Sequence, residues 1–200
     1  VAQQGAQVLS YQRDGEQPLI WLSEQAGFAR GVSVRGGAPV CWPWFGDLTR
    51  NPAQVQALHD NPALATFHGE VRALDWQLTG VASEGEAAIL DFAFVAPNPE
   101  LLGNWRDVEL TLSIRLDQRL TLRLSSHNRG QARLALSQAL HTYFAIGDIH
   151  QIQVHGLDGC RYIETLEDWG ERQQSGAVGF SGETDRIYLG VPSRVSLGPG

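Results

Sequence analysis

The chain has 200 residues, of which 42% are hydrophobic and 18% are charged, a balance typical of a globular protein with a real core. Its net charge of -7 argues against nucleic acid or an anionic membrane surface as a partner, and no apolar run is long enough to span a bilayer. All 15 basic residues are arginines, so chemistry that needs a Schiff-base lysine is excluded.

In chain order, the first half predicts one short strand at residues 19–22, an irregular corner at residues 34–46 and a weak helix at residues 53–60. The corner combines three glycines, two prolines and three aromatic residues around Arg35. Glycine permits close backbone approaches and proline interrupts helices, so we expect a stiff, aromatic-walled turn with Arg35 at its edge.

The second half predicts mainly strands. Apolar and polar residues alternate strictly over residues 108–116 and again from residue 120, which indicates an antiparallel hairpin with a turn at Asp117 and Gln118. Shorter apolar runs at residues 88–96, 132–140 and 149–154 complete the pattern. Many strands at short spacing favour an all-β sandwich, although alternation alone does not choose between sandwich types.

Four segments of the chain resemble, in order and spacing, the glucose-6-phosphate 1-epimerases, the hexose-phosphate branch of the aldose 1-epimerase (galactose mutarotase-like) family. They are the corner from Arg35 to Gly46, His-Gly-Glu-Val-Arg at residues 68–72, Leu-His-Thr-Tyr-Phe at residues 140–144, and Asp-Arg-Ile-Tyr at residues 185–188. The second segment keeps both ends of the family's His-Gly-Phe-Ala-Arg and changes the middle.

The resemblance implies a galactose mutarotase-like β-sandwich of large antiparallel sheets, with the sugar in an open cleft. We expect residues 1–200 to be a single aldose 1-epimerase-like domain that is truncated at both ends. The implied activity is interconversion of the α and β anomers of a hexose 6-phosphate, without a cofactor. We expect a cytoplasmic monomer whose partner is a small sugar phosphate.

Anomer interconversion needs an acid for the ring oxygen and a base for the C1 hydroxyl, which suits a histidine and a carboxylate. His141 is the predicted acid, and a core histidine is the alternative. His68 is predicted to hydrogen-bond the sugar, or else to cap a turn beside Gly69. The resemblance assigns the base to a glutamate late in the family's domain, which has no counterpart before Gly200.

Arg35 and Arg72 are the predicted phosphate clamp, because two guanidinium groups offer many charged donors. Surface salt bridges are the alternative for both. Asp185 is predicted to accept hydrogen bonds from sugar hydroxyls, unless it pairs with Arg186. Aromatic faces suit a sugar ring, so Trp42, Trp44 and Phe45 are candidates for the pocket wall or for the core.

Two other classes of function are alternatives. A metal-dependent sugar-phosphate isomerase on a β-barrel needs clustered ligands, but the chain has no His-x-His, and Cys41 and Cys160 have no metal-ligand spacing. We therefore predict no metal site. A non-catalytic sugar-phosphate-binding module stays open, as does an unphosphorylated aldose as substrate.

Overall fold

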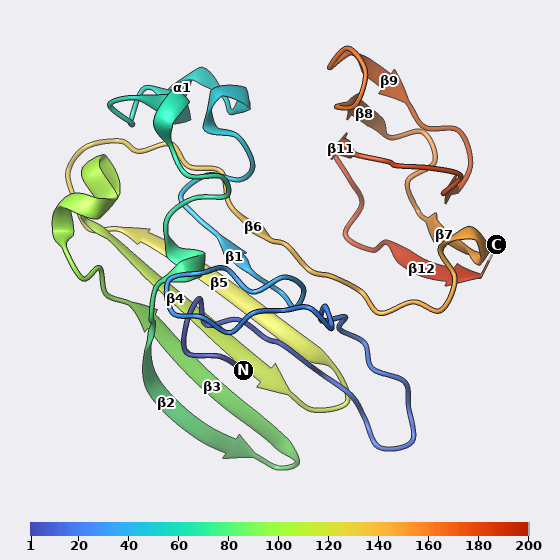
Figure 1. Ribbon diagram of the computed structural model, residues 1–200, viewed down its shortest axis with the longest axis horizontal. Helices are drawn as coiled ribbons and strands as arrows, with labels where there is room; N and C mark the ends of the chain where they lie inside the picture. Colours follow the sequence, from blue (N-terminus) through green and yellow to red (C-terminus); the bar gives the residue numbers. More distant parts are fainter. Residues whose placement is uncertain (200) are drawn as a thin grey trace. The chain divides into compact units, whose positions relative to one another are not determined.

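The computed structural model of the chain describes residues 1–199. It divides into two compact units, Val1–Ala145 and Ile146–Gly200, and each is treated by itself. Both consist mainly of antiparallel strands with few helical turns, which confirms the all-β prediction (Figure 1). The single-domain organisation stays a prediction.

The first unit is built on a four-stranded antiparallel meander, in which each strand pairs with the next along the chain (Figure 1). Its strands are β2 (Gln77–Glu84), β3 (Ala87–Phe94), β4 (Val108–Leu116) and β5 (Leu120–Asn128). The predicted hairpin is the β4–β5 pair, with Leu112 opposite Leu124. Strand β2 was not predicted, because nearly all of its residues are exposed and no apolar alternation marks it.

Alternation in β4 explains how the sheet covers a core. Leu110, Leu112 and Ile114 are at most 2% exposed, whereas the side chains between them lie on the more accessible face. Burial of each such side chain stabilises the fold by roughly 2 kcal/mol relative to exposure. One face of the meander therefore supplies much of the core of the first unit.

Four tryptophans complete this core, and each indole N–H has an acceptor. Trp42 donates to Ser126 Oγ at 3.1 Å and Trp44 to the Thr66 carbonyl at 2.8 Å. Trp76 and Trp105 likewise donate to backbone carbonyls. Satisfied polar atoms let these large rings be buried without the cost of an unpaired donor.

Short elements connect the core to the rest of the first unit. They are β1 (Val40–Cys41), which pairs with β6 (Ala139–Leu140), helix α1 (Ala53–Gln56), and 3-10 turns at Leu48–Arg50, Pro62–Leu64, Val71–Ala73 and Pro99–Trp105.

Three sequence predictions in this unit were wrong in extent. The helix predicted at 53–60 ends at Gln56, and only the last two residues of the predicted strand at 132–140 are paired. Residues 19–22 make isolated bridges instead of a strand, joining Ile20 to Phe144 and Leu22 to Gly36.

The second unit holds two small antiparallel sheets. One contains β10 (Val178–Gly179), β7 (Ile152–His155) and β12 (Ser196–Pro199) in that order, and the other contains β11 (Arg186–Leu189), β8 (Arg161–Glu164) and β9 (Glu171–Gln173). The strand predicted at 149–154 begins only at Ile152, because Asp148 accepts from the His150 N–H and caps a 3-10 turn at Ile149–Gln151.

Candidate functional site

A close backbone contact joins the first two family-like segments. Gly69 has φ +76°, and a Cβ there would lie 2.1 Å from the Trp42 carbonyl oxygen. The same carbonyl accepts the Glu70 N–H at 2.9 Å. Because only glycine tolerates both the dihedral angle and the contact, Gly69 fixes His68 beside the corner.

The third segment is tied to the corner through another glycine. Gly37 has φ +72°, its N–H donates to the Trp21 carbonyl, and its own carbonyl accepts the Tyr143 N–H at 2.9 Å. Two residues away, the His141 N–H donates to the Pro39 carbonyl at 2.9 Å. Residues distant in sequence are thereby placed around one point by main-chain hydrogen bonds.

The two histidines lie next to each other, with ring centroids 5.2 Å apart. The Gly46 N–H donates to His68 Nδ1 at 3.0 Å, which assigns the proton of the neutral ring to Nε2. Burial first, and then the charges of Arg72 and His141, lower the pKa of His68 from 6.5 to about 4. His68 is therefore a neutral hydrogen-bond donor at pH 7.

Aromatic rings surround this pair. Phe45 lies 4.9 Å from the His68 ring and 5.5 Å from the His141 ring, and Tyr143 lies 5.0 Å from His141. Of the aromatic residues predicted as a pocket wall, only Phe45 is here. Trp42 and Trp44 are at most 1% exposed and belong to the core.

A pocket of about 160 Å³ opens at this point, smaller than the sites of drug-sized ligands. Four predicted site residues line it together, namely Arg35, Arg72, His68 and His141. Sequence reasoning gave no role to the other five residues that line it. Three of these, Pro39, Cys41 and Tyr143, lie in the family-like segments, and Ser33 and Val34 lie just before the first of them.

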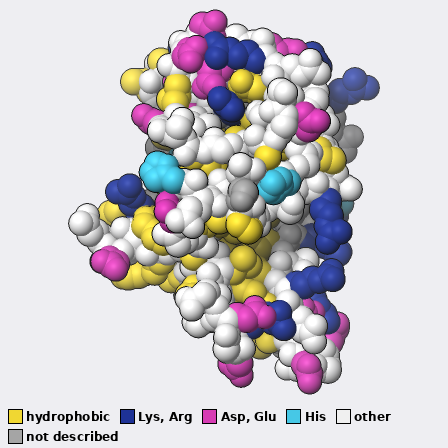
Figure 2. Space-filling model, turned by 90° about the vertical axis from the view of Figure 1, so that its right-hand side faces the viewer, with side chains coloured by type: hydrophobic (Ala, Val, Ile, Leu, Met, Phe, Trp, Pro, Cys, Tyr) yellow, Lys and Arg dark blue, Asp and Glu magenta, His cyan; other side chains and the backbone are white. Residues whose placement is uncertain are grey.

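Positive charge is concentrated in this pocket. Arg72 is half-buried and Arg35 is exposed, and within residues 1–199 neither forms an ion pair with a carboxylate. Burial raises the pKa of the Cys41 thiol to about 11 even though Arg72 acts in the opposite direction. Arginine and acidic side chains are both present on the face drawn in Figure 2. The pocket can thus attract an anion to a chain of net negative charge.

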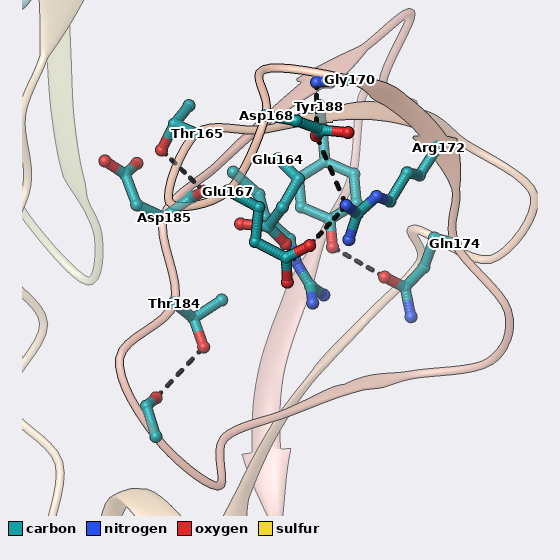
Figure 3. Close-up of polar contacts among 12 residues, drawn as sticks. Glu164, Thr165, Glu167, Asp168, Gly170, Arg172, Gln174, Thr184, Asp185 and Tyr188 are labelled. Atoms are coloured by element: carbon teal, nitrogen blue, oxygen red, sulfur yellow. Dashed lines mark hydrogen bonds and ion pairs between the residues drawn. The ribbon is translucent and has the colours of Figure 1, made fainter.

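Asp185 belongs to the second unit, where its side chain is exposed. The predicted alternative, an ion pair with Arg186, is wrong, because Arg186 Nε donates to Glu164 instead at 2.9 Å. The carbonyl of Asp185 accepts two hydrogen bonds from Thr165 (Figure 3). Its carboxylate makes no hydrogen bond or ion pair within residues 1–199.

Residues 1–197 match the family model described as aldose 1-epimerase. The chain belongs to the aldose 1-epimerase family. It is 37% identical over 190 residues to an Escherichia coli K12 protein with the provisional name glucose-6-phosphate 1-epimerase, a match that covers 94% of this chain and 58% of that protein. A Salmonella typhimurium protein of the same provisional name is 34% identical with the same coverage. The chain thus spans about three fifths of these relatives.

Solved structures agree with this membership. A crystal structure from Salmonella typhimurium, described as that of a provisional mutarotase, matches with a TM-score of 0.82 and 32% identity, over 97% of this chain and 60% of that one. A Synechocystis protein at 21% identity has a TM-score of 0.74, which speaks for the fold alone. The fold is galactose mutarotase-like, as the resemblance implied.

Residues 1–199 lack the features of two other classes of site. No helix there is long and apolar enough to cross a membrane. In the same range, no three histidine, cysteine or acidic side chains gather so that they could hold a metal ion.

Proposed function

We propose that this protein interconverts the α and β anomers of a hexose 6-phosphate, with glucose 6-phosphate as the best candidate. One observation carries the proposal: Arg35, Arg72, His68 and His141 line the same pocket in a chain of the aldose 1-epimerase family. Two arginines that form no ion pair with a carboxylate of residues 1–199 suit a phosphate, since guanidinium groups bind its oxygens through paired, charge-assisted hydrogen bonds.

In the proposed reaction, His141 protonates the ring oxygen as the bond from C1 to that oxygen breaks. The open aldehyde then turns its other face, and His141 takes the proton back on reclosure. His68 is the neutral neighbour, and its Nε2–H donates to the oxygen that carries the developing charge. A histidine held neutral does this at pH 7 without competing with His141 for the proton.

The reaction also needs a base for the proton of the C1 hydroxyl. Among residues 1–199, no carboxylate lines the pocket. The proposal assigns the base to a glutamate in the part of the family's domain that is not matched by residues 1–197. The same observation favours a second candidate, a sugar-phosphate-binding module that does not catalyse the reaction.

We propose further that Asp185 accepts hydrogen bonds from two adjacent sugar hydroxyls, for which a planar carboxylate without an ion-pair partner is suited. The proposal retains the cytoplasmic location and the monomeric state expected from the sequence. Size-exclusion chromatography with light scattering tests the monomer.

The test is NMR exchange spectroscopy on the two anomers of glucose 6-phosphate, with His141→Ala beside the unaltered protein. We expect fast exchange that the substitution abolishes. Arg35→Ala should raise KM for glucose 6-phosphate far more than for glucose, and equal effects would refute the phosphate clamp. Binding of glucose 6-phosphate without accelerated exchange would favour the binding module.

A further inference from the structure

Glu164 is a buried carboxylate for which the proposed reaction has no use. It is 5% exposed, and it lies on β8 directly opposite Arg186 on β11. A carboxylate removed from water is costly unless it is paired, and Arg186 Nε supplies the partner at 2.9 Å. The Arg186 guanidinium also lies 4.6 Å from the centre of the Tyr162 ring. Arg186 is therefore held on this face of the sheet from two sides.

The next residue of the chain, Thr165, holds the residue before Arg186. Its N–H donates to the Asp185 carbonyl at 3.1 Å, and its hydroxyl donates to the same oxygen at 2.9 Å. Consecutive residues at the end of β8 thus bind consecutive residues at the start of β11. Such a double attachment fixes the backbone from which the Asp185 side chain projects.

The two attachments leave the Asp185 carboxylate available for a ligand. Arg186 is the first residue of β11 and faces Glu164, whereas Asp185 lies just before the strand begins. Figure 3 shows the Asp185 carboxylate directed away from Glu164. With Arg186 occupied by Glu164, the cation nearest in sequence to Asp185 does not neutralise it.

We propose that Glu164 and Thr165 are positioning residues for the Asp185 carboxylate, a role that rests on the proposed function of Asp185 as a ligand of sugar hydroxyls. Thr165 fixes the main chain of Asp185, and Glu164 keeps Arg186 away from its carboxylate. Neither residue touches the sugar. Their effect on sugar binding passes only through Asp185, which makes it separable from their contribution to folding.

A double-mutant cycle tests this in the full polypeptide, with KM for glucose 6-phosphate taken from NMR anomer exchange. Thr165→Val removes the hydroxyl and keeps the shape and the N–H. We expect it to raise KM roughly three- to tenfold, the value of one hydrogen bond, with little change in kcat. In an Asp185→Ala background, the same substitution should leave KM unchanged. Glu164→Gln should behave in the same way.

Matched controls come from the same unit. Thr184→Val removes a hydroxyl that donates only to the Gly182 carbonyl, and Glu167→Gln alters an exposed ion pair with Arg172. Neither should change KM. The melting temperature of every variant is recorded, because loss of the buried Glu164–Arg186 pair also lowers stability.

The outcomes separate the two proposals. If the unaltered protein exchanges anomers and the Thr165→Val effect persists without the Asp185 carboxylate, Thr165 acts on folding and the positioning role is overturned. If Thr165→Val leaves KM unchanged both with and without the Asp185 carboxylate, that role is overturned as well. If the unaltered protein neither exchanges nor binds glucose 6-phosphate, the proposed function and the positioning role are refuted together.

Discussion

The charge of Arg72 should control the protonation of His68. At present the pKa of His68 is about 4, lowered by burial first, then by Arg72 and then by His141. Arg72→Gln removes the positive charge and keeps much of the side-chain volume. We expect the pKa of His68 to rise above 4 and to stay below 6.5, because burial and His141 still act.

The size of the effect is bounded by these causes. The difference between 6.5 and about 4 corresponds to roughly 3 kcal/mol against protonation, and solvent around the half-buried ring reduces this value. Because burial is the largest cause, Arg72 accounts for less than half of this free energy, or at most about 1.4 kcal/mol. The expected increase in the pKa of His68 is therefore at most about one unit.

The assay is an NMR titration of the histidine ring C2 protons, with the His68 signal assigned from its absence in a His68→Gln variant. An unchanged pKa in Arg72→Gln would refute the electrostatic role of Arg72. A return to 6.5 would refute burial as the main cause.

The lowered pKa also fixes the sign of a stability effect. Between pH 6.5 and 4 the unfolded chain binds a proton at His68 that the folded chain does not, so the free energy of unfolding falls as the pH falls through this range. Arg72→Gln raises the pKa of His68 in the folded chain and so narrows the pH range over which stability is lost. Urea unfolding at pH 7 and pH 4 should show a smaller loss in the variant, and a larger one would contradict the assignment.

Three further predictions concern the rest of the first unit and the thiols. Gly69→Ala should lower the free energy of unfolding in urea by more than about 3 kcal/mol, because its Cβ would meet a carbonyl oxygen at 2.1 Å. Gly46→Ala, at φ +68° with open space, should lower it by only about 1 kcal/mol. Equal losses would contradict the close contact. An aromatic disulfide reagent at pH 8 should label the half-buried Cys160 well before the buried Cys41, whose pKa is about 11, and mass spectrometry identifies the labelled thiol. Ile114→Val should lower the free energy of unfolding by about 1 kcal/mol, and a neutral result would mean that the core relaxes around the lost methyl group.

The local sequence pattern was sufficient to predict the strands that bury one face. The alternation over residues 108–116 predicted β4 correctly, because its apolar positions meet the core at every second residue. The same reasoning missed β2, whose residues are mostly exposed and are held by backbone pairing to β3. It also overextended the strand at residues 132–140, where only Ala139 and Leu140 pair with another strand, β1.

The site could be predicted only through the resemblance. Arg35, His68 and His141 are far apart in sequence, and hydrogen bonds between main chains bring them together, which no local pattern reports. The burial of two tryptophans also depends on residues that are distant in sequence. Trp42 and Trp44 looked suited to a sugar wall, but acceptors at Ser126 and Thr66 allow their burial, and these partners are invisible from the corner alone.

The residue pair at Gly46 and His68 has a consequence for how the protein can vary. The His68 N–H donates to the Gly46 carbonyl at 2.9 Å, and the Gly46 N–H donates to the His68 ring at 3.0 Å. The segment between Gly46 and His68 therefore has both of its ends at the same place, and its Leu64 is 80% exposed. Residues inserted or deleted near Leu64 would lengthen or shorten an outer loop without moving the imidazole. This outer loop is thus free to vary in length among related proteins while the histidine stays in place.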